Sequence, residues 1–324
     1  MMTPSNGNMT VFRKWTAMLR IPNLAIIVLT QYLLGYGIIR PYFLEQGSDM
    51  PLGHLNFFVL VLTTLLIAAG GYIINDHFDV NTDRRNKPGK NMLDGLISVR
   101  MALRVYYIIN GIAILLGFYL AWQTGSYQLG LIFPAITGLL WFYSSRYQRM
   151  PFWGNFIVSL LSATVILFPW LFNFMSLLRD GDEFVKIMGQ LADINSYIWA
   201  FAFFAFLVSM FREVIKDIQD VSGDSAMGYR TIPVIWGVNV SRGIAAALVV
   251  ITMVCLALAQ WYLYASAKIL PFWYLLVAVQ TILIYLLYLI AIKKDPEDYG
   301  FLGQTSKIIM LAGILSIELI YISH

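Results

Sequence analysis

Residues 55–83 read LNFFVLVLTTLLIAAGGYIINDHFDVNTD, an apolar run that ends in a cluster of acidic side chains. The first part of this stretch, 55–75, is long enough to cross a bilayer as a helix, which takes about 20 largely apolar residues. The acidic cluster begins directly at the end of that expected span. This order predicts a polar site at a membrane surface.

The whole chain has the composition of a membrane protein. Of its 324 residues, 59% are hydrophobic and 12% are charged, whereas a soluble domain carries about 25% charged residues. The apolar runs predict an all-α, polytopic membrane protein with nine transmembrane helices in one bundle. These helices are expected near 22–44, 55–75, 101–122, 127–145, 153–178, 196–214, 242–266, 270–292 and 305–322.

Most of the 22 Lys and Arg residues fall at the N-terminus and in the loops after the second, fourth, sixth and eighth expected spans. Such residues are enriched on the cytoplasmic side of membrane proteins. The pattern predicts a plasma (inner) membrane protein with a cytoplasmic N-terminus and the C-terminus outside. The net charge of +4 is then a topology signal. No nucleic-acid partner is expected, because the basic residues form no continuous stripe.

The two longest polar stretches, about 76–100 and 215–241, occupy matching places after the second and sixth spans. This arrangement predicts one domain over 1–324 built from two related halves, about 1–150 and 151–324. No separate soluble domain and no obligate protein partner are expected.

Each polar stretch begins with acidic residues at helical spacing. A helix turns about 100° per residue, so Asn75, Asp79 and Asp83 would share one face. In the second stretch, residues 212–224 read REVIKDIQDVSGD. By the same arithmetic its four acids fall within about 60° of one another, although Gly223 is a candidate helix end just before Asp224.

A bound cation would explain this alignment of carboxylates. Like charges four residues apart on a helix are unfavourable by a few tenths of a kcal/mol per pair, and carboxylates near a bilayer lose hydration. Hard oxygen ligands suit Mg²⁺, which commonly bridges carboxylates to substrate phosphates. Zinc is not expected, because the chain has one cysteine and three histidines. The alternative for each cluster alone is a solvated polar helix end.

The motifs resemble the signatures of the UbiA superfamily of intramembrane prenyltransferases. Residues 75–88, NDHFDVNTDRRNKP, resemble the first signature, and residues 217–233, DIQDVSGDSAMGYRTIP, resemble the second. Residues 20–23, RIPN, and the pairs Tyr-Ser at 143–144 and Gly-Asn at 154–155 are similar to further family motifs. Residues 212–221 are most similar to the digeranylgeranylglyceryl phosphate synthase branch. Departures from the usual pattern are Gln148, where a lysine is common, and Ser222, where that branch usually has glutamate.

The resemblance implies a helical bundle around a central cavity capped by cytoplasmic loops. The implied metal ligands, for Mg²⁺, are Asn75, Asp79, Asp83, Asp217, Asp220 and Asp224. The implied catalytic residues are Asp79, Asp83, Asp217 and Asp220. The implied substrate-binding residues are Arg20, Asn23, Lys87, Tyr143, Arg149, Arg212 and Lys216.

The implied reaction transfers an isoprenyl group from a prenyl diphosphate, expected to be geranylgeranyl diphosphate, through an allylic carbocation. The expected acceptor is lipophilic, with geranylgeranylglyceryl phosphate as the first choice. An aromatic quinone precursor such as 4-hydroxybenzoate is the alternative acceptor. A cation-coupled transporter is a more distant alternative, and it would place its carboxylates near the bilayer midplane.

Overall fold

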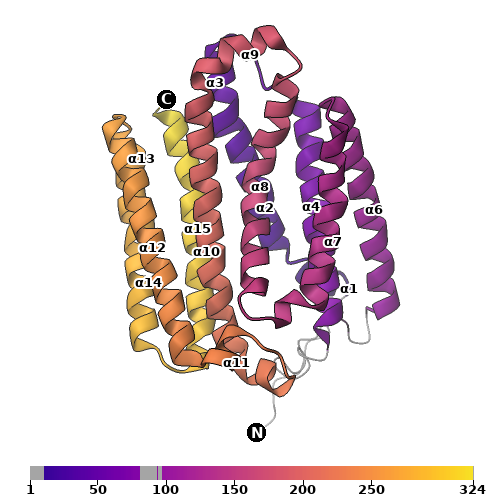
Figure 1. The fold of residues 1–324 in the computed structure, drawn as a ribbon, viewed down its shortest axis with the longest axis vertical. Helices are drawn as coiled ribbons and strands as arrows, with labels where there is room; N and C mark the ends of the chain where they lie inside the picture. The colour runs from indigo at the N-terminus through magenta and orange to yellow at the C-terminus, as the bar shows by residue number, and fades with distance from the viewer. Residues whose placement is uncertain (1–10, 81–92, 94–96, 324) are drawn as a thin grey trace.

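The computed structural model describes residues 11–80, 93 and 97–323, and within them all regular secondary structure is helical. The helices run side by side in an elongated bundle (Figure 1). In the described part of the chain, eight helical segments are long and apolar enough to cross a membrane. The protein is therefore an integral membrane protein, as its composition predicts.

The bounds of these segments follow the expected spans closely. They are α2–η1–α3 (Ile21–Leu33, Leu34–Ile39, Arg40–Glu45), α4 (His54–Phe78), α6 (Val99–Gln123), α8 (Trp153–Leu177), α9–η4–α10 (Gly181–Ile187, Met188–Gln190, Leu191–Ala226), α12 (Val238–Ala265), α13–η5–α14 (Ile269–Tyr274, Leu275–Gln280, Thr281–Ile292) and α15 (Tyr299–Ile322). A short amphipathic helix, α1 (Val11–Met18), precedes them.

The fourth expected span is helical but shorter than the others. A 3₁₀ turn, η2 (Tyr127–Leu131), leads into α7 (Ile132–Ser145), whose 14 residues fall below the length of a regular span. Pro134 lies in the first turn of α7, where a missing N–H breaks no helical hydrogen bond. The α7 helix packs against α4. The expected number of nine therefore corresponds to eight full-length spans and this shorter helix.

The two acidic stretches end their helices differently. The α4 helix stops at Phe78, and Asp79 is its C-terminal cap. The α10 helix continues for 36 residues, through Gly223 to Ala226. The sequence-based suggestion that Gly223 ends this helix is therefore wrong, and Asp224 stays within the helix.

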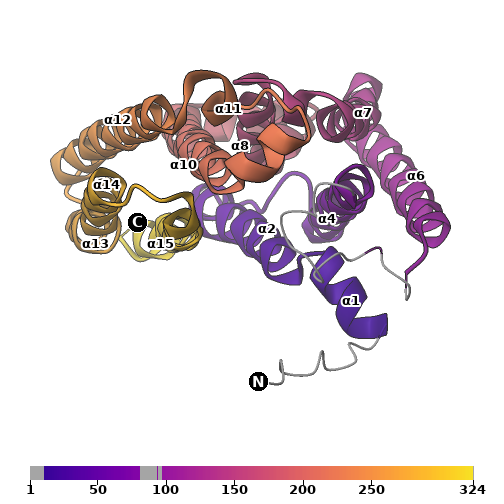
Figure 2. The same cartoon turned by 90° about the horizontal axis from the view of Figure 1, so that it is seen from below.

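Six helices surround the centre of the bundle. Viewed from below (Figure 2), α2, α4 and α15 form one side, while α7, α8 and α10 form the other. The α12 and α14 helices stand beyond this ring at one edge and α6 at the opposite edge. Small residues allow close packing: a Cβ on Gly117 of α6 would lie 2.1 Å from the ring of Phe133, an approach that is typical of membrane helix contacts.

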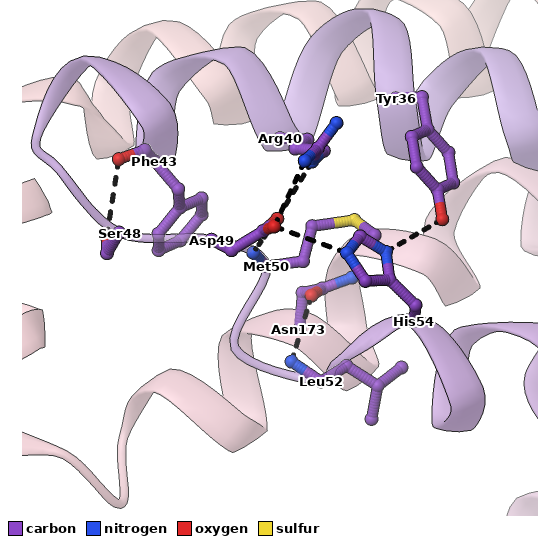
Figure 3. Close-up of polar contacts among 9 residues, drawn as sticks. All are labelled: Tyr36, Arg40, Phe43, Ser48, Asp49, Met50, Leu52, His54 and Asn173. Atoms are coloured by element: carbon purple, nitrogen blue, oxygen red, sulfur yellow. Dashed lines mark hydrogen bonds and ion pairs between the residues drawn. The ribbon is translucent and has the colours of Figure 1, made fainter.

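A polar network holds the connection between α3 and α4 (Figure 3). The Asp49 carboxylate accepts hydrogen bonds from Arg40 Nε at 2.8 Å and from the Met50 backbone N–H at 2.7 Å, and its Oδ2 lies 3.2 Å from His54 Nε2. The other ring nitrogen of His54 lies 2.8 Å from the Tyr36 hydroxyl. This network is at the end of the bundle opposite α11 (Ile232–Trp236) (Figure 1).

Candidate active site

A cavity of about 310 Å³ lies between α2, α4, α7, α8, α10 and α15. Most of its wall is apolar, including Ile26, Phe168 and Phe201. Polar side chains gather in one part of the wall, which is formed by Arg20, Asn23, Tyr72, Asn75, Tyr143, Arg212, Glu213, Lys216 and Lys307. This distribution suits an amphipathic molecule with a polar head and a long apolar chain.

The first acidic set lies at the end of α4. The Asn75 amide donates a hydrogen bond to the Asp79 carboxylate, and Gln148 Nε2 donates a second one at 2.9 Å. Asp79 is therefore fixed from two different elements. The predicted residues Asp83 and Lys87 lie outside the described residues.

The second acidic set lies in the last turns of α10. Asp217 accepts a hydrogen bond of 2.8 Å from Asn155 Nδ2 of α8, and Asp224 accepts one of 3.2 Å from the Thr231 hydroxyl. Asp220 lies between them on the same helix. A carboxylate has about four acceptor positions, so these contacts orient Asp217 and Asp224 while leaving room for a further ligand.

The two acidic sets approach each other. Asp79 interacts electrostatically with Asp224, and the buried Tyr143 interacts with both Asp79 and Asp217. Carboxylates that converge in this way favour a bound cation, and these oxygen donors are the kind that Mg²⁺ prefers. In the part of the chain that the structure describes, no three acidic, histidine or cysteine side chains form a metal cluster by themselves. Mg²⁺ commonly takes part of its coordination from substrate phosphates and water.

Arg20 is fixed at the start of α2. Its guanidinium donates a hydrogen bond of 3.1 Å to Asp76 and lies 4.8 Å from the centre of the Tyr72 ring. The backbone of Arg20 is left-handed, with φ of 51°, which costs a non-glycine residue about 1–2 kcal/mol. Asp76 thus pairs with Arg20, whose side chain lines the cavity and remains 41% exposed.

The structure gives Glu213 a different role from the other acids of its helix. The Glu213 carboxylate lies 2.7 Å from Arg212 Nη1 and 3.8 Å from Lys216 Nζ. A buried carboxylate that bridges two cations is stabilised by them, so Glu213 holds both basic side chains at the cavity wall.

Among the substrate-binding candidates that the structure describes, only Arg149 does not line the cavity. Its guanidinium lies 4.7 Å from the centre of the Tyr229 ring and donates a hydrogen bond of 3.4 Å to the Phe78 carbonyl. Arg149 therefore links the end of α4 to the segment before α11, close to Asp79.

Sequence reasoning gave no role in the site to three residues: the donors Gln148 and Asn155 and the cation Lys307. The sequence signal for Asn155 was the Gly-Asn pair at 154–155, and the signal for Gln148 was its place where a lysine is common. Lys307 was visible as the one basic residue within the apolar run 305–322.

Comparison with known proteins agrees with this geometry. The model of the UbiA prenyltransferase family matches residues 32–308. The chain belongs to the UbiA prenyltransferase family. It is accordingly a transferase of prenyl groups. This assignment, together with acids that gather at one end of the helices, leaves the transporter alternative without support.

Similar UbiA-family proteins are curated under one name. The chain is 27% identical over 274 residues to digeranylgeranylglyceryl phosphate synthase of Thermococcus sibiricus, covering 83% of this chain and 88% of that protein. It is 28% identical over 268 residues to the protein of the same name from Methanosphaera stadtmanae, covering 82% and 89%.

Two solved structures share the fold of this UbiA-family chain. A structure described for digeranylgeranylglyceryl phosphate synthase has a TM-score of 0.61 at 22% identity and covers 96% of this chain and 99% of that one. A UbiA homologue from Archaeoglobus fulgidus bound to DMAPP and Mg²⁺ has a TM-score of 0.55 at 16% identity, with 94% and 99% covered.

Proposed function

We propose that this protein transfers a geranylgeranyl group from geranylgeranyl diphosphate to the hydroxyl of geranylgeranylglyceryl phosphate in a Mg²⁺-dependent reaction. The observation that carries the proposal is the meeting of carboxylates from α4 and α10 beside the polar wall of an otherwise apolar cavity. The names of the curated relatives support the choice of acceptor.

The proposed metal ligands are Asn75, Asp79, Asp83, Asp217, Asp220 and Asp224. When bound, Mg²⁺ would neutralise the diphosphate and stabilise the charge that develops on it as it leaves. Gln148 and Asn155 would orient Asp79 and Asp217 from outside the coordination shell, because second-shell partners fix the direction of metal ligands.

The reaction breaks the bond between the first prenyl carbon and the diphosphate oxygen, and the electron pair leaves with the diphosphate. The acceptor hydroxyl oxygen then bonds to the allylic carbon and loses its proton, which the released diphosphate or water takes up. Tyr72 and Tyr143 line the polar part of the cavity. Their rings supply π faces that favour a nearby cation.

We further place the polar end of the cavity at the cytoplasmic side of the plasma membrane, with the C-terminus outside. The clustering of Lys and Arg in the loops at this end supports that orientation. The chain would form one domain of two related halves, because α4 and α10 each bring an acidic set to the same site.

The test is a transfer assay with purified protein in detergent. Radiolabelled geranylgeranyl diphosphate is supplied with and without Mg²⁺, and geranylgeranylglyceryl phosphate or 4-hydroxybenzoate is the acceptor. We expect Mg²⁺-dependent product with the glycerol phosphate, lost in Asp79→Ala and Asp220→Ala but retained in Asp182→Ala, a control in α9. Product with 4-hydroxybenzoate alone would show that the acceptor is an aromatic compound. No product with either acceptor would refute the proposal.

A further inference from the structure

The polar wall of the cavity carries more positive charge than its own acids neutralise. Four cations, Arg20, Arg212, Lys216 and Lys307, line this wall, and all four interact electrostatically with the single buried carboxylate of Glu213. Among the described residues, Glu213 makes close ion pairs with Arg212 and Lys216, and Asp76 pairs with Arg20, so two carboxylates face four cations. The wall therefore has the electrostatics of an anion site.

Of the four cations, Lys307 has the fewest close partners to balance its positive charge. Within the described residues its side chain makes no hydrogen bond and no ion pair, and its electrostatic neighbours include the like charges of Arg212 and Arg20. It lies inside the membrane-spanning helix α15. A charged residue in a membrane span is costly, by about 2.5–3.5 kcal/mol at the helix centre, and usually marks a substrate or ion site.

The packing of α10 against α15 sets the depth of Lys307. A Cβ on Gly300 would lie 3.1 Å from the Gln219 side chain, and a Cβ on Gly313 would lie 2.7 Å from the ring of Phe204. Because residue numbers rise along α15 as they fall along α10, the two helices are antiparallel, and these contacts fix their register.

Lys307 lies near the middle between the two glycines on α15, and Arg212 lies near the middle between their partners on α10. The two side chains are therefore at about the same depth in the cavity wall. At 1.5 Å per residue, Arg212 is about 7–12 Å along α10 from the levels of Asp217 and Asp220. The pair is thus displaced from the proposed diphosphate site, toward the apolar part of the cavity.

We propose that Arg212 and Lys307 form a binding site for the phosphate group of the acceptor lipid. This inference rests on the proposed function and adds the feature that selects its acceptor. A guanidinium binds two phosphate oxygens at once and an ammonium adds a point charge. The Glu213 bridge holds Arg212 in place, so the phosphate would meet a preformed partner. An acceptor without the negative phosphate would leave the positive charge of Lys307 unbalanced.

The experiment measures binding and transfer separately. Binding of labelled geranylgeranylglyceryl phosphate is measured without Mg²⁺, so that transfer does not proceed. It is measured in nanodiscs of zwitterionic lipid and in nanodiscs that also contain anionic phospholipid. Transfer is measured with this acceptor and with geranylgeranylglycerol, which lacks the phosphate. The variants are Lys307→Gln, the conservative Lys307→Arg and the control Lys294→Gln, which removes an exposed lysine that follows α14.

We expect Lys307→Gln to weaken binding of the phosphate acceptor and raise its KM by about 10- to 100-fold, the range for losing a hydrogen bond to a charged group. The KM for the prenyl diphosphate and the activity with geranylgeranylglycerol should stay unchanged, Lys307→Arg should restore binding, and Lys294→Gln should behave as wild type.

Three results would overturn the site. A rise in the KM for the prenyl diphosphate would assign Lys307 to the diphosphate. An equal loss with both acceptors would show a structural role. A change only in nanodiscs that contain anionic phospholipid would show that Lys307 binds bulk headgroups. If wild type binds the phosphate acceptor through Lys307 but transfers nothing to it, the proposed function fails and the site stands.

Discussion

Asn155 of α8 donates a hydrogen bond of 2.8 Å to the Asp217 carboxylate of α10. The two residues come from different helices, and Asn155 lies only two residues after the start of α8. The contact fixes the direction of one proposed metal ligand from outside the coordination shell.

Asn155→Ala is expected to raise the Mg²⁺ concentration for half-maximal transfer by about 10- to 100-fold, the usual effect of removing a second-shell partner. Activity at saturating Mg²⁺ should largely recover. The control is Asn56→Ala, which removes an amide that bonds Leu52 and Tyr119 away from the acidic sets. An unchanged Mg²⁺ dependence in Asn155→Ala would argue against Asp217 as a ligand.

Two glycines of α6 offer a matched test of helix packing. A Cβ on Gly117 would collide with Phe133, whereas a Cβ on Gly111 meets no atom within 4 Å. Gly117→Ala should therefore destabilise the protein by about 1–3 kcal/mol, the cost of overpacking. Gly111→Ala should be neutral or stabilising, because alanine is the better helix former. Thermal unfolding in detergent measures the stability of both variants. Equal unfolding midpoints for Gly117→Ala and Gly111→Ala would contradict the described α6–α7 contact.

Phe204 separates the central cavity from a second apolar cavity of about 350 Å³ between α10, α12 and α15. Phe201 and Phe204 line both cavities. Phe204→Ala is expected to join them, which would make room for a longer prenyl chain. Since one methylene in an apolar pocket changes discrimination about 10- to 200-fold, the preference for a 25-carbon over a 20-carbon diphosphate should rise at least about 10-fold.

Competition between the two diphosphates in the transfer assay measures that ratio. Phe203→Ala is the control, because Phe203 lines the second cavity but not the central one. If Phe204→Ala lowers turnover with both chain lengths and leaves the ratio unchanged, the ring has no part in setting chain length.

The network at the other end of the bundle predicts an acid-dependent loss of stability. Hydrogen bonds from Arg40 lower the pKa of Asp49 to about 2. A carboxyl whose pKa is lower in the folded state stabilises the fold above its unfolded pKa and loses this contribution as the pH falls through its folded pKa. The contribution should therefore disappear between about pH 4 and pH 2. Asp49 is 43% exposed, so solvent screening limits it to about 1 kcal/mol.

Thermal unfolding of wild type and Asp49→Asn between pH 6 and pH 2 checks this. The difference in midpoint should be present at pH 6 and vanish near pH 2. Asp182→Asn, at an exposed acid in α9 near the same end of the bundle, should give no comparable pH-dependent difference. A wild-type advantage of Asp49 that persists at pH 2 would contradict the prediction.

The sequence by itself determined the membrane class, the approximate spans and the identity of the two acidic sets. These features are local: span length follows from the number of consecutive apolar residues, and the acids are neighbours on their own helix segments. The short helix α7 and the continuation of α10 past Gly223 were beyond this reasoning, because packing against neighbouring helices decides where a helix ends.

Only the tertiary structure decided how individual polar residues of the site are used. Asp76 makes an ion pair with Arg20, and Glu213 makes ion pairs with Arg212 and Lys216. Their spacing in the sequence had placed both acids beside the proposed metal ligands. Lys307 lies at about the depth of Arg212 because close packing at two glycines fixes the register of α15 on α10. Such pairings depend on the depth at which distant helices meet, and no local pattern in the sequence carries that information.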